Sequence, residues 1–203
     1  MHKRAACGLM AGLLAVALAG GCHTPRAPRT GYVPVEEEGV MTAGLDDHDY
    51  DLMAAGLVRE MLQRGLPKGY VVALGPVDTR ECPYDVRVVQ FQKSLMVLLN
   101  KEGTLRFMSA VDAITPGGSA AQEIYQLMQY NWLNRNPIDV EDLQTLGRLA
   151  QVNGILFGRV SALERNLGRN GREVTYRFVW ELSNTQSGVL DIAHEEKIRK
   201  NVR

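Results

Sequence analysis

A strict alternation of apolar and polar residues near the C-terminus constrains the fold of this chain more than any other feature of its sequence. Val174, Tyr176, Phe178, Trp180 and Leu182 are separated by single residues that are mostly polar. A period of two places successive side chains on opposite faces of a β-strand, so that one face is apolar and the other mostly polar. The segment therefore predicts a strand that covers a hydrophobic core on one side.

The segments around this strand predict an antiparallel three-strand meander. Residues 154–165 read as a strand, and the turn at 167–171 ends in Asn-Gly, the pair that short hairpin loops favour. Residues 184–188 (Asn-Thr-Gln-Ser-Gly) predict the next turn, and residues 189–198 predict the returning strand. The last third of the sequence is therefore expected to consist of strands and turns.

The region before the meander switches between helical and strand patterns. Apolar residues at helical spacing predict helices, and short apolar runs predict buried strands. The expected helices cover 49–64 (capped by Asp49 or Asp51), 85–101, 119–131 and 139–151, and the expected strands cover 70–74, closed by Gly75-Pro76, and 105–109. Strands separated by helices indicate crossover connections. We therefore expect an α/β (α+β) fold with a mixed sheet of about five strands flanked by helices.

The first 21 residues have the organisation of a lipoprotein signal peptide. Lys3 and Arg4 precede an apolar run, Leu9 to Leu18, which is shorter than the roughly 20 residues that span a bilayer as a helix. Small residues then lead to Cys22 in the sequence Leu-Ala-Gly-Gly-Cys. We expect cleavage before Cys22 and acylation of this residue, for example with palmitate; an ordinary secretory signal with an incidental cysteine is the alternative.

Residues 22–49 are predicted to form a disordered tether, and residues 50–203 are predicted to form one globular domain. The tether segment is rich in proline, glycine and acidic residues, and it shows no hydrophobic periodicity. About 28 residues of flexible coil have an r.m.s. reach of roughly 30 Å, or about 90 Å when fully stretched. The remainder is long enough to bury a core of its own.

The charges and histidines do not indicate an enzyme. The chain has 23 basic and 23 acidic residues, and removal of Lys3 and Arg4 with the signal leaves the mature chain at −2. No basic stripe interleaved with aromatic residues is present, so nucleic acid is not an expected partner. His194 lies beside Glu195 and Glu196 on a predicted strand, where an exposed strand residue is a simpler interpretation than a catalytic triad. The sequence has no nucleophile elbow, phosphate loop or dinucleotide fingerprint, so we expect no catalytic residue and no cofactor.

Two further features have possible ligand chemistry. The acidic run from Asp46 to Asp51 offers carboxylates at short spacing, but it lacks the glycine and distal glutamate of a calcium loop. A solvated lead-in to a helix is the favoured interpretation, and no metal site is expected. Cys82 has no partner within the mature chain once Cys22 is acylated, so a shielded thiol and a link between molecules are the alternatives.

Two groups of aromatic residues are candidates for contact with a ligand or a partner. At strand spacing, Tyr176, Phe178 and Trp180 are better explained as a packed sheet face than as a binding platform. Tyr130 and Trp132 lie among Asn and Gln residues in a weakly patterned region. An exposed aromatic residue there would suit a partner contact, and a small core beneath a loop is the alternative. Tyr130 and Trp132 are therefore the candidate partner-contact residues.

The C-terminal motifs resemble the LpoB family of penicillin-binding protein activators. The similar segments are Val174 to Leu182, Thr185 to Gly188 and Glu195 to Lys200, and upstream the helix, turn and strand from Leu146 to Gly158. The resemblance covers roughly residues 50–203, and the lipoprotein signal agrees with it. Related domains of the CsgG type and the TolB amino-terminal type share this α/β plan.

The resemblance implies a protein that binds and regulates without catalysing a reaction. It would be an outer-membrane lipoprotein, anchored through Cys22 on the periplasmic face. Its monomeric domain would bind a bifunctional class A penicillin-binding protein and activate peptidoglycan synthesis. Two features depart from the family: Val189 stands where many members have a tryptophan, and the tether is shorter than in the best-known members. An envelope-assembly or secretion lipoprotein of the CsgG type is the alternative.

Overall fold

The computed structural model describes residues 43–167 and 171–202. Within these two ranges, no helix is both long enough and apolar enough to cross a membrane. The lipidation candidate Cys22, the expected signal peptide and most of the expected tether lie outside the described residues, as does the tip of the hairpin at 168–170. The description of the fold therefore begins at Ala43.

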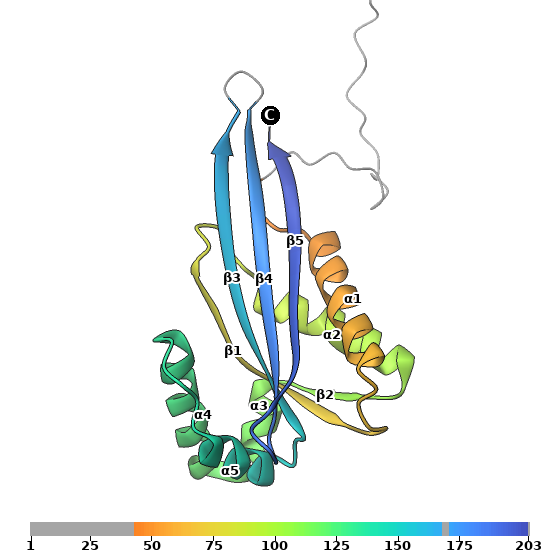
Figure 1. The fold of residues 1–203 in the computed structure, drawn as a ribbon, viewed down its shortest axis with the longest axis vertical. Helices are drawn as coiled ribbons and strands as arrows, with labels where there is room; N and C mark the ends of the chain where they lie inside the picture. Colours follow the sequence, from red (N-terminus) through yellow and green to blue (C-terminus); the bar gives the residue numbers. More distant parts are fainter. Residues whose placement is uncertain (1–42, 168–170, 203) are drawn as a thin grey trace, which may run out of the picture. The chain divides into compact units, whose positions relative to one another are not determined.

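A mixed five-stranded sheet forms the centre of the domain, with the strand order β2-β1-β3-β4-β5 (Figure 1). The strands are β1 (Val71–Glu81), β2 (Arg106–Met108), β3 (Gly154–Asn166), β4 (Arg172–Asn184) and β5 (Leu190–Val202). Strand β1 pairs in parallel with β2 and β3, whereas β3, β4 and β5 pair antiparallel. The expected fold class and the C-terminal meander are therefore confirmed.

Helices pack on both faces of this sheet. They are α1 (Asp47–Gln63), α2 (Val88–Glu102), α3 (Ala110–Ile114), α4 (Gly118–Leu133) and α5 (Val140–Ala150), with a 3-10 turn η1 (Thr115–Gly117) before α4. Helices α1 and α2 cover one face, where they form the larger core with β4. Helices α3 to α5 cover part of the other face, where they form a smaller core with β1 and β3.

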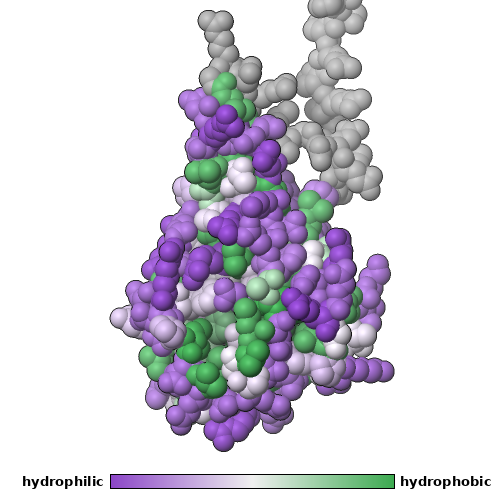
Figure 2. All heavy atoms as spheres, in the orientation of Figure 1, coloured by the Kyte–Doolittle hydropathy of each residue, from purple (hydrophilic) through white to green (hydrophobic). Residues whose placement is uncertain are grey.

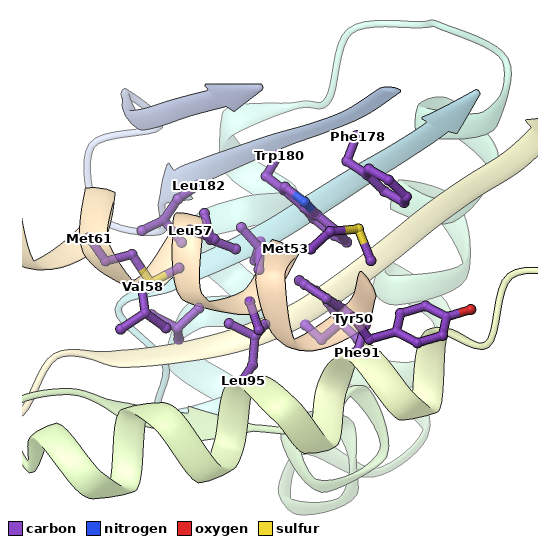
Figure 3. Close-up of a cluster of buried hydrophobic side chains, with 14 of the residues drawn as sticks. Tyr50, Met53, Leu57, Val58, Met61, Phe91, Leu95, Phe178, Trp180 and Leu182 are labelled. Carbon is purple, nitrogen blue, oxygen red and sulfur yellow. The ribbon is translucent and has the colours of Figure 1, made fainter. Parts of the chain in front are cut away.

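The larger core contains the apolar side of the alternating strand, as the sequence predicts (Figure 3). Tyr176, Phe178 and Trp180 are buried, and the ring of Phe91 from α2 stacks on Trp180 with the ring centroids 4.2 Å apart. Helix α1 presents Met53 and Leu57 to the same core. The aromatic row is therefore a packed sheet face and does not form a binding platform.

The first helix begins earlier than its apolar pattern indicates. Its N-cap is Asp46, whose carboxylate accepts a hydrogen bond from the Asp49 amide, while the Asp49 carboxylate accepts one from the Asp46 amide. This reciprocal capping box satisfies two amides that a helix start leaves unpaired. Ala43 is only 8% exposed and belongs to the larger core. The folded part of the chain thus includes residues 43–49, which the sequence pattern assigns to the tether.

Strand β1 continues past Gly75 and Pro76, where the sequence predicts its end. The pairing with β3 shifts register between Leu74 and Val77, so the Gly-Pro pair forms a bulge within the strand. Proline has no amide hydrogen to donate, and a bulge is one of the few places where a strand tolerates it. A Cβ atom on Gly75 would lie 2.8 Å from Ile155 Cγ2, so the close approach of β3 requires glycine there.

Helices α2 and α3 both differ from what the local sequence pattern predicts. Helix α2 begins at Val88 instead of Asp85, and the amide of its N-cap residue Arg87 donates to Tyr50 Oη of α1 at 2.8 Å. Helix α3 was not expected, because five residues are too few to show a helical period. Its first turn is held by Ser109, whose hydroxyl oxygen accepts from the Asp112 amide at 3.0 Å.

Candidate partner-binding surface

Helix α4 carries both aromatic residues that the sequence singles out, and their environments differ. Trp132 is 8% exposed, lies against the Phe157 ring at a centroid distance of 5.0 Å, and donates its Nε1 hydrogen to Gly158 O at 2.8 Å. Trp132 therefore fastens α4 to β3 as part of the smaller core, which favours the alternative that the sequence left open, and a partner contact of Trp132 stays a prediction. Tyr130 is 62% exposed and remains the candidate partner-contact residue of this pair.

Beyond α4, the second face of the meander has no helix over it among the described residues (Figure 1). The strand register places twelve side chains on this surface, which we call the open face. They are Arg159, Ser161, Leu163 and Arg165 of β3, Glu173, Thr175, Arg177 and Val179 of β4, and Glu195, Lys197, Arg199 and Asn201 of β5. Figure 2 shows a largely hydrophilic surface with scattered hydrophobic residues. On the open face, Leu163 is 73% exposed.

Basic residues outnumber acidic residues on the open face, because the set contains five Arg and Lys residues and two Glu residues. Glu195 accepts hydrogen bonds from Arg177 Nη2 at 2.6 Å and lies 2.8 Å from Lys197 Nζ. The bond from Arg177 and then that from Lys197 lower the pKa of Glu195 to about 2. Since one carboxylate serves two cations, the open face keeps an excess of positive charge.

Arg159 marks the boundary between the open face and the core beneath α4. Its guanidinium carbon lies 4.7 Å from the centroid of the Trp132 ring, a cation–π geometry. Its Nε lies 4.0 Å from Oδ2 of the buried Asp78 and has no hydrogen-bond partner among the described residues. Asp78 is bound in bidentate fashion by Arg80, with both N–O distances 2.9 Å. Burial alone would raise the pKa of Asp78, but the bonds from Arg80 outweigh it and lower that pKa.

His194 and Cys82 both lie against packed parts of the domain. The His194 side chain is 15% exposed, less than an open strand position would give, because it faces α1 at Gly56, where an added Cβ would lie 3.2 Å from its Nε2. Its Nε2 lies 3.4 Å from Glu196 Oε2.

Cys82 is half-buried against the larger core, and burial raises the pKa of its thiol. A raised pKa lowers the thiolate fraction and hence the reactivity of a cysteine.

The acidic run acts as a helix cap, and its carboxylates meet a lysine. The Nζ atom of Lys200 lies 3.1 Å from Asp46 Oδ2 and also forms an ion pair with Asp49. Within residues 43–167 and 171–202, no group of three or more His, Cys, Asp or Glu side chains is placed to hold a metal ion. The run is therefore explained by capping and by a buried ion pair.

A hollow of about 1020 Å³ lies between α5 and the β4–β5 turn. Two of its polar side chains are engaged in the fold: Thr185 Oγ1 donates to Val152 O at 2.7 Å, and Gln144 Nε2 donates to Gln186 O at 2.8 Å. Gly147 of α5 allows Thr185 to approach, since an added Cβ would lie 2.4 Å from Thr185 Cβ. These contacts join α5 to the β4–β5 turn.

Comparisons with known proteins found no matching family model and no matching curated protein. Several solved structures are similar. The C-terminal domain of LpoB from Salmonella enterica is 15% identical, with a TM-score of 0.48 over 74% of this chain and 98% of that one. The NMR structure of Escherichia coli LpoB is 13% identical, with a TM-score of 0.47 over 97% and 94% of the two chains. A PelC dodecamer from Paraburkholderia phytofirmans is 13% identical, with a TM-score of 0.38 over 66% and 75%.

LpoB domains, the family that the C-terminal motifs resemble, are thus among the solved structures found to be similar to this chain. Identities of 13–15% do not carry function from one protein to another. The function of this chain is therefore argued from its own residues.

Proposed function

We propose that this chain is an outer-membrane lipoprotein that binds a bifunctional class A penicillin-binding protein and stimulates its synthesis of peptidoglycan. The lipoprotein signal before Cys22, the expected tether and the resemblance of the C-terminal motifs support this function. The protein acts by contact, without a bond-making step of its own. It works from the periplasmic face of the outer membrane.

The observation that carries the proposal is the open face. Sites for small molecules are usually concave and largely apolar, whereas this surface is a broad, polar face of a rigid antiparallel sheet. Its strands are each 13 residues long, and the larger core on their other side fixes them. Such a surface is suited to a protein partner.

The charge on the open face favours an acidic partner surface. Arg177 and Lys197 share Glu195, and Arg199 lies 3.8 Å from Glu173. Arg165 adds a further positive charge to this face. Exposed ion pairs contribute little to stability, so this surface has little structural need for so many charges. An unbalanced set of charges instead steers association, and the effect weakens as salt screens it. We therefore expect the partner to present excess Asp and Glu to this face.

A direct test measures glycan polymerisation by a purified class A penicillin-binding protein. The mature chain carrying Cys22→Ser, which cannot be acylated, is added at increasing concentration. We expect the polymerisation rate to rise and saturate, and the half-saturating concentration to increase with salt. Lys197→Gln with Arg199→Gln should raise that concentration at least severalfold.

The matched control is Lys93→Gln with Lys101→Gln on the exposed side of α2, which changes the net charge equally on the other side of the sheet. This variant should stimulate the synthase like the wild type. The proposal fails if the wild-type chain neither binds the synthase nor changes its rate. A large ring on size-exclusion chromatography in detergent would favour the CsgG-type assembly lipoprotein instead.

A further inference from the structure

Lys200 is the one buried lysine among the described residues, and its ammonium group meets the chain at the point where it enters the fold. The residue is 3% exposed on β5. Its Nζ donates to Gly44 O at 2.8 Å and to Asp46 Oδ2 at 3.1 Å, and it forms an ion pair with Asp49. A lysine ammonium has three hydrogens to donate. All three of its acceptors lie within residues 44–49.

A second contact fastens the same segment to the neighbouring strand. The hydroxyl of Tyr176 on β4 donates to the carbonyl oxygen of Ala43, and the Tyr176 ring is fully buried in the larger core. Ala43 is itself part of that core. Backbone carbonyls of two consecutive residues, Ala43 and Gly44, are thus held by side chains of two adjacent strands.

The charges make Lys200 hard to replace. Asp46 and Asp49 face each other across the capping box, and two carboxylates this close repel unless a cation lies between them. Burial raises the pKa of Asp49. For Asp46, burial is outweighed by the Asp49 amide and by Lys200, so its pKa is lowered. Removal of one partner from a buried ion pair leaves an uncompensated charge, which is far more destabilising than loss of an exposed pair.

We propose that Lys200 and Tyr176 form a clamp that fastens the segment arriving from Cys22 to strands β5 and β4. Tension in that segment is then borne by the sheet and does not open the first turn of α1. Because one ammonium group holds acceptors on Gly44, Asp46 and Asp49, opening of the first turn of α1 must also break contacts to Lys200. The inference rests on the proposed function in one respect, that the chain before Ala43 leads to an anchor at Cys22.

Pulling on single molecules tests the clamp without any synthase. The mature, unacylated chain carries Cys82→Ser, so that one handle attaches at Cys22, and Lys101→Cys on α2 takes the second handle. With the clamp intact, we expect only the smooth stretching of the tether, and no separate extension step, before the domain unfolds. With Lys200→Met, residues 43–49 should be released first, which adds an early extension of about 25 Å at low force. The control Lys197→Met, on the opposite face of β5, should behave like the chain with the clamp intact.

Hydrogen exchange keeps the test decisive if Lys200→Met folds poorly. Tyr176→Phe removes the hydroxyl that binds Ala43 and keeps the ring in the core. In this variant we expect the amides of Asp46, Asp49 and Tyr50 to exchange severalfold faster, while amides of the β3–β4 ladder keep their wild-type rates. The clamp is overturned if neither variant extends early and neither accelerates exchange in this segment. A synthase that failed to bind would overturn the proposed function and leave this result unchanged.

Discussion

The Nε1 hydrogen of Trp132 is donated to the carbonyl oxygen of Gly158 at 2.8 Å, which joins helix α4 to the middle of strand β3. On the other face of the sheet, Trp180 lies against the same glycine, where an added Cβ would be 2.3 Å from Cζ3 of its ring. Both tryptophans of the chain therefore meet at Gly158. This residue marks the boundary at which helical cover gives way to the open face, since Arg159 follows it.

Substitution of Gly158 by alanine should destabilise the domain by about 1–3 kcal/mol, the usual cost of overpacking a core. The new methyl group would clash with Trp180, which cannot move freely because it is stacked on Phe91 at 4.2 Å. Urea unfolding measures the change in the free energy of unfolding. Gly44→Ala is the control, because no atom lies within 4 Å of an added Cβ there. Equal midpoints for the two variants would contradict the packing described here.

Trp132→Phe should lower the free energy of unfolding by about 1–3 kcal/mol. The variant keeps an aromatic ring against Phe157 but cannot donate to the Gly158 carbonyl, so a buried hydrogen bond is lost. The midpoint of urea unfolding, monitored by circular dichroism, provides the measurement. A stability equal to that of the wild type would show that the hydrogen bond contributes nothing.

Tyr130→Ala should leave stability within about 0.5 kcal/mol of the wild type, because the side chain is mostly exposed. If Tyr130 contacts the synthase, the variant should bind the synthase more weakly by about 1 kcal/mol or more, which is roughly fivefold in Kd. Calorimetric titration of the synthase measures this effect. Unchanged affinity would remove Tyr130 from the interface and leave the open face as the remaining candidate.

Arg177→Met should raise the pKa of Glu195 from about 2 towards its usual value of 4.5. The folded-state pKa lies below the unfolded value, so the pair stabilises the fold above about pH 4.5, and this contribution is lost as the pH falls towards 2. Carbon-detected NMR titration of the Glu195 carboxyl group gives the pKa directly. Lys93→Met on α2 serves as the control and should leave the titration unchanged, whereas a Glu195 pKa that stays near 2 in Arg177→Met would contradict the ion pair.

The sequence by itself determined the elements whose signals are local. The alternation from Val174 to Leu182 predicts β4, and the apolar spacing predicts the buried side of α1, because backbone geometry fixes how side chains repeat along a strand or helix. The apolar pattern predicts the N-cap of α1 at Asp49 or Asp51, whereas the N-cap is Asp46. The signal for Asp46 was present, since Asp46 and Asp49 have the three-residue spacing of a capping box.

Only the tertiary structure decided which of these residues are buried, clamped or left open. Trp132 is a core residue because Gly158, 26 residues away, offers a carbonyl beneath it. Lys200 is buried because residues 44–49, more than 150 positions earlier, bring it two carboxylates. The open face exists because α4 ends at Leu133, beside the lower part of the meander. A one-dimensional pattern records the period of side chains along each element, but the partner of each side chain is set by how the elements pack.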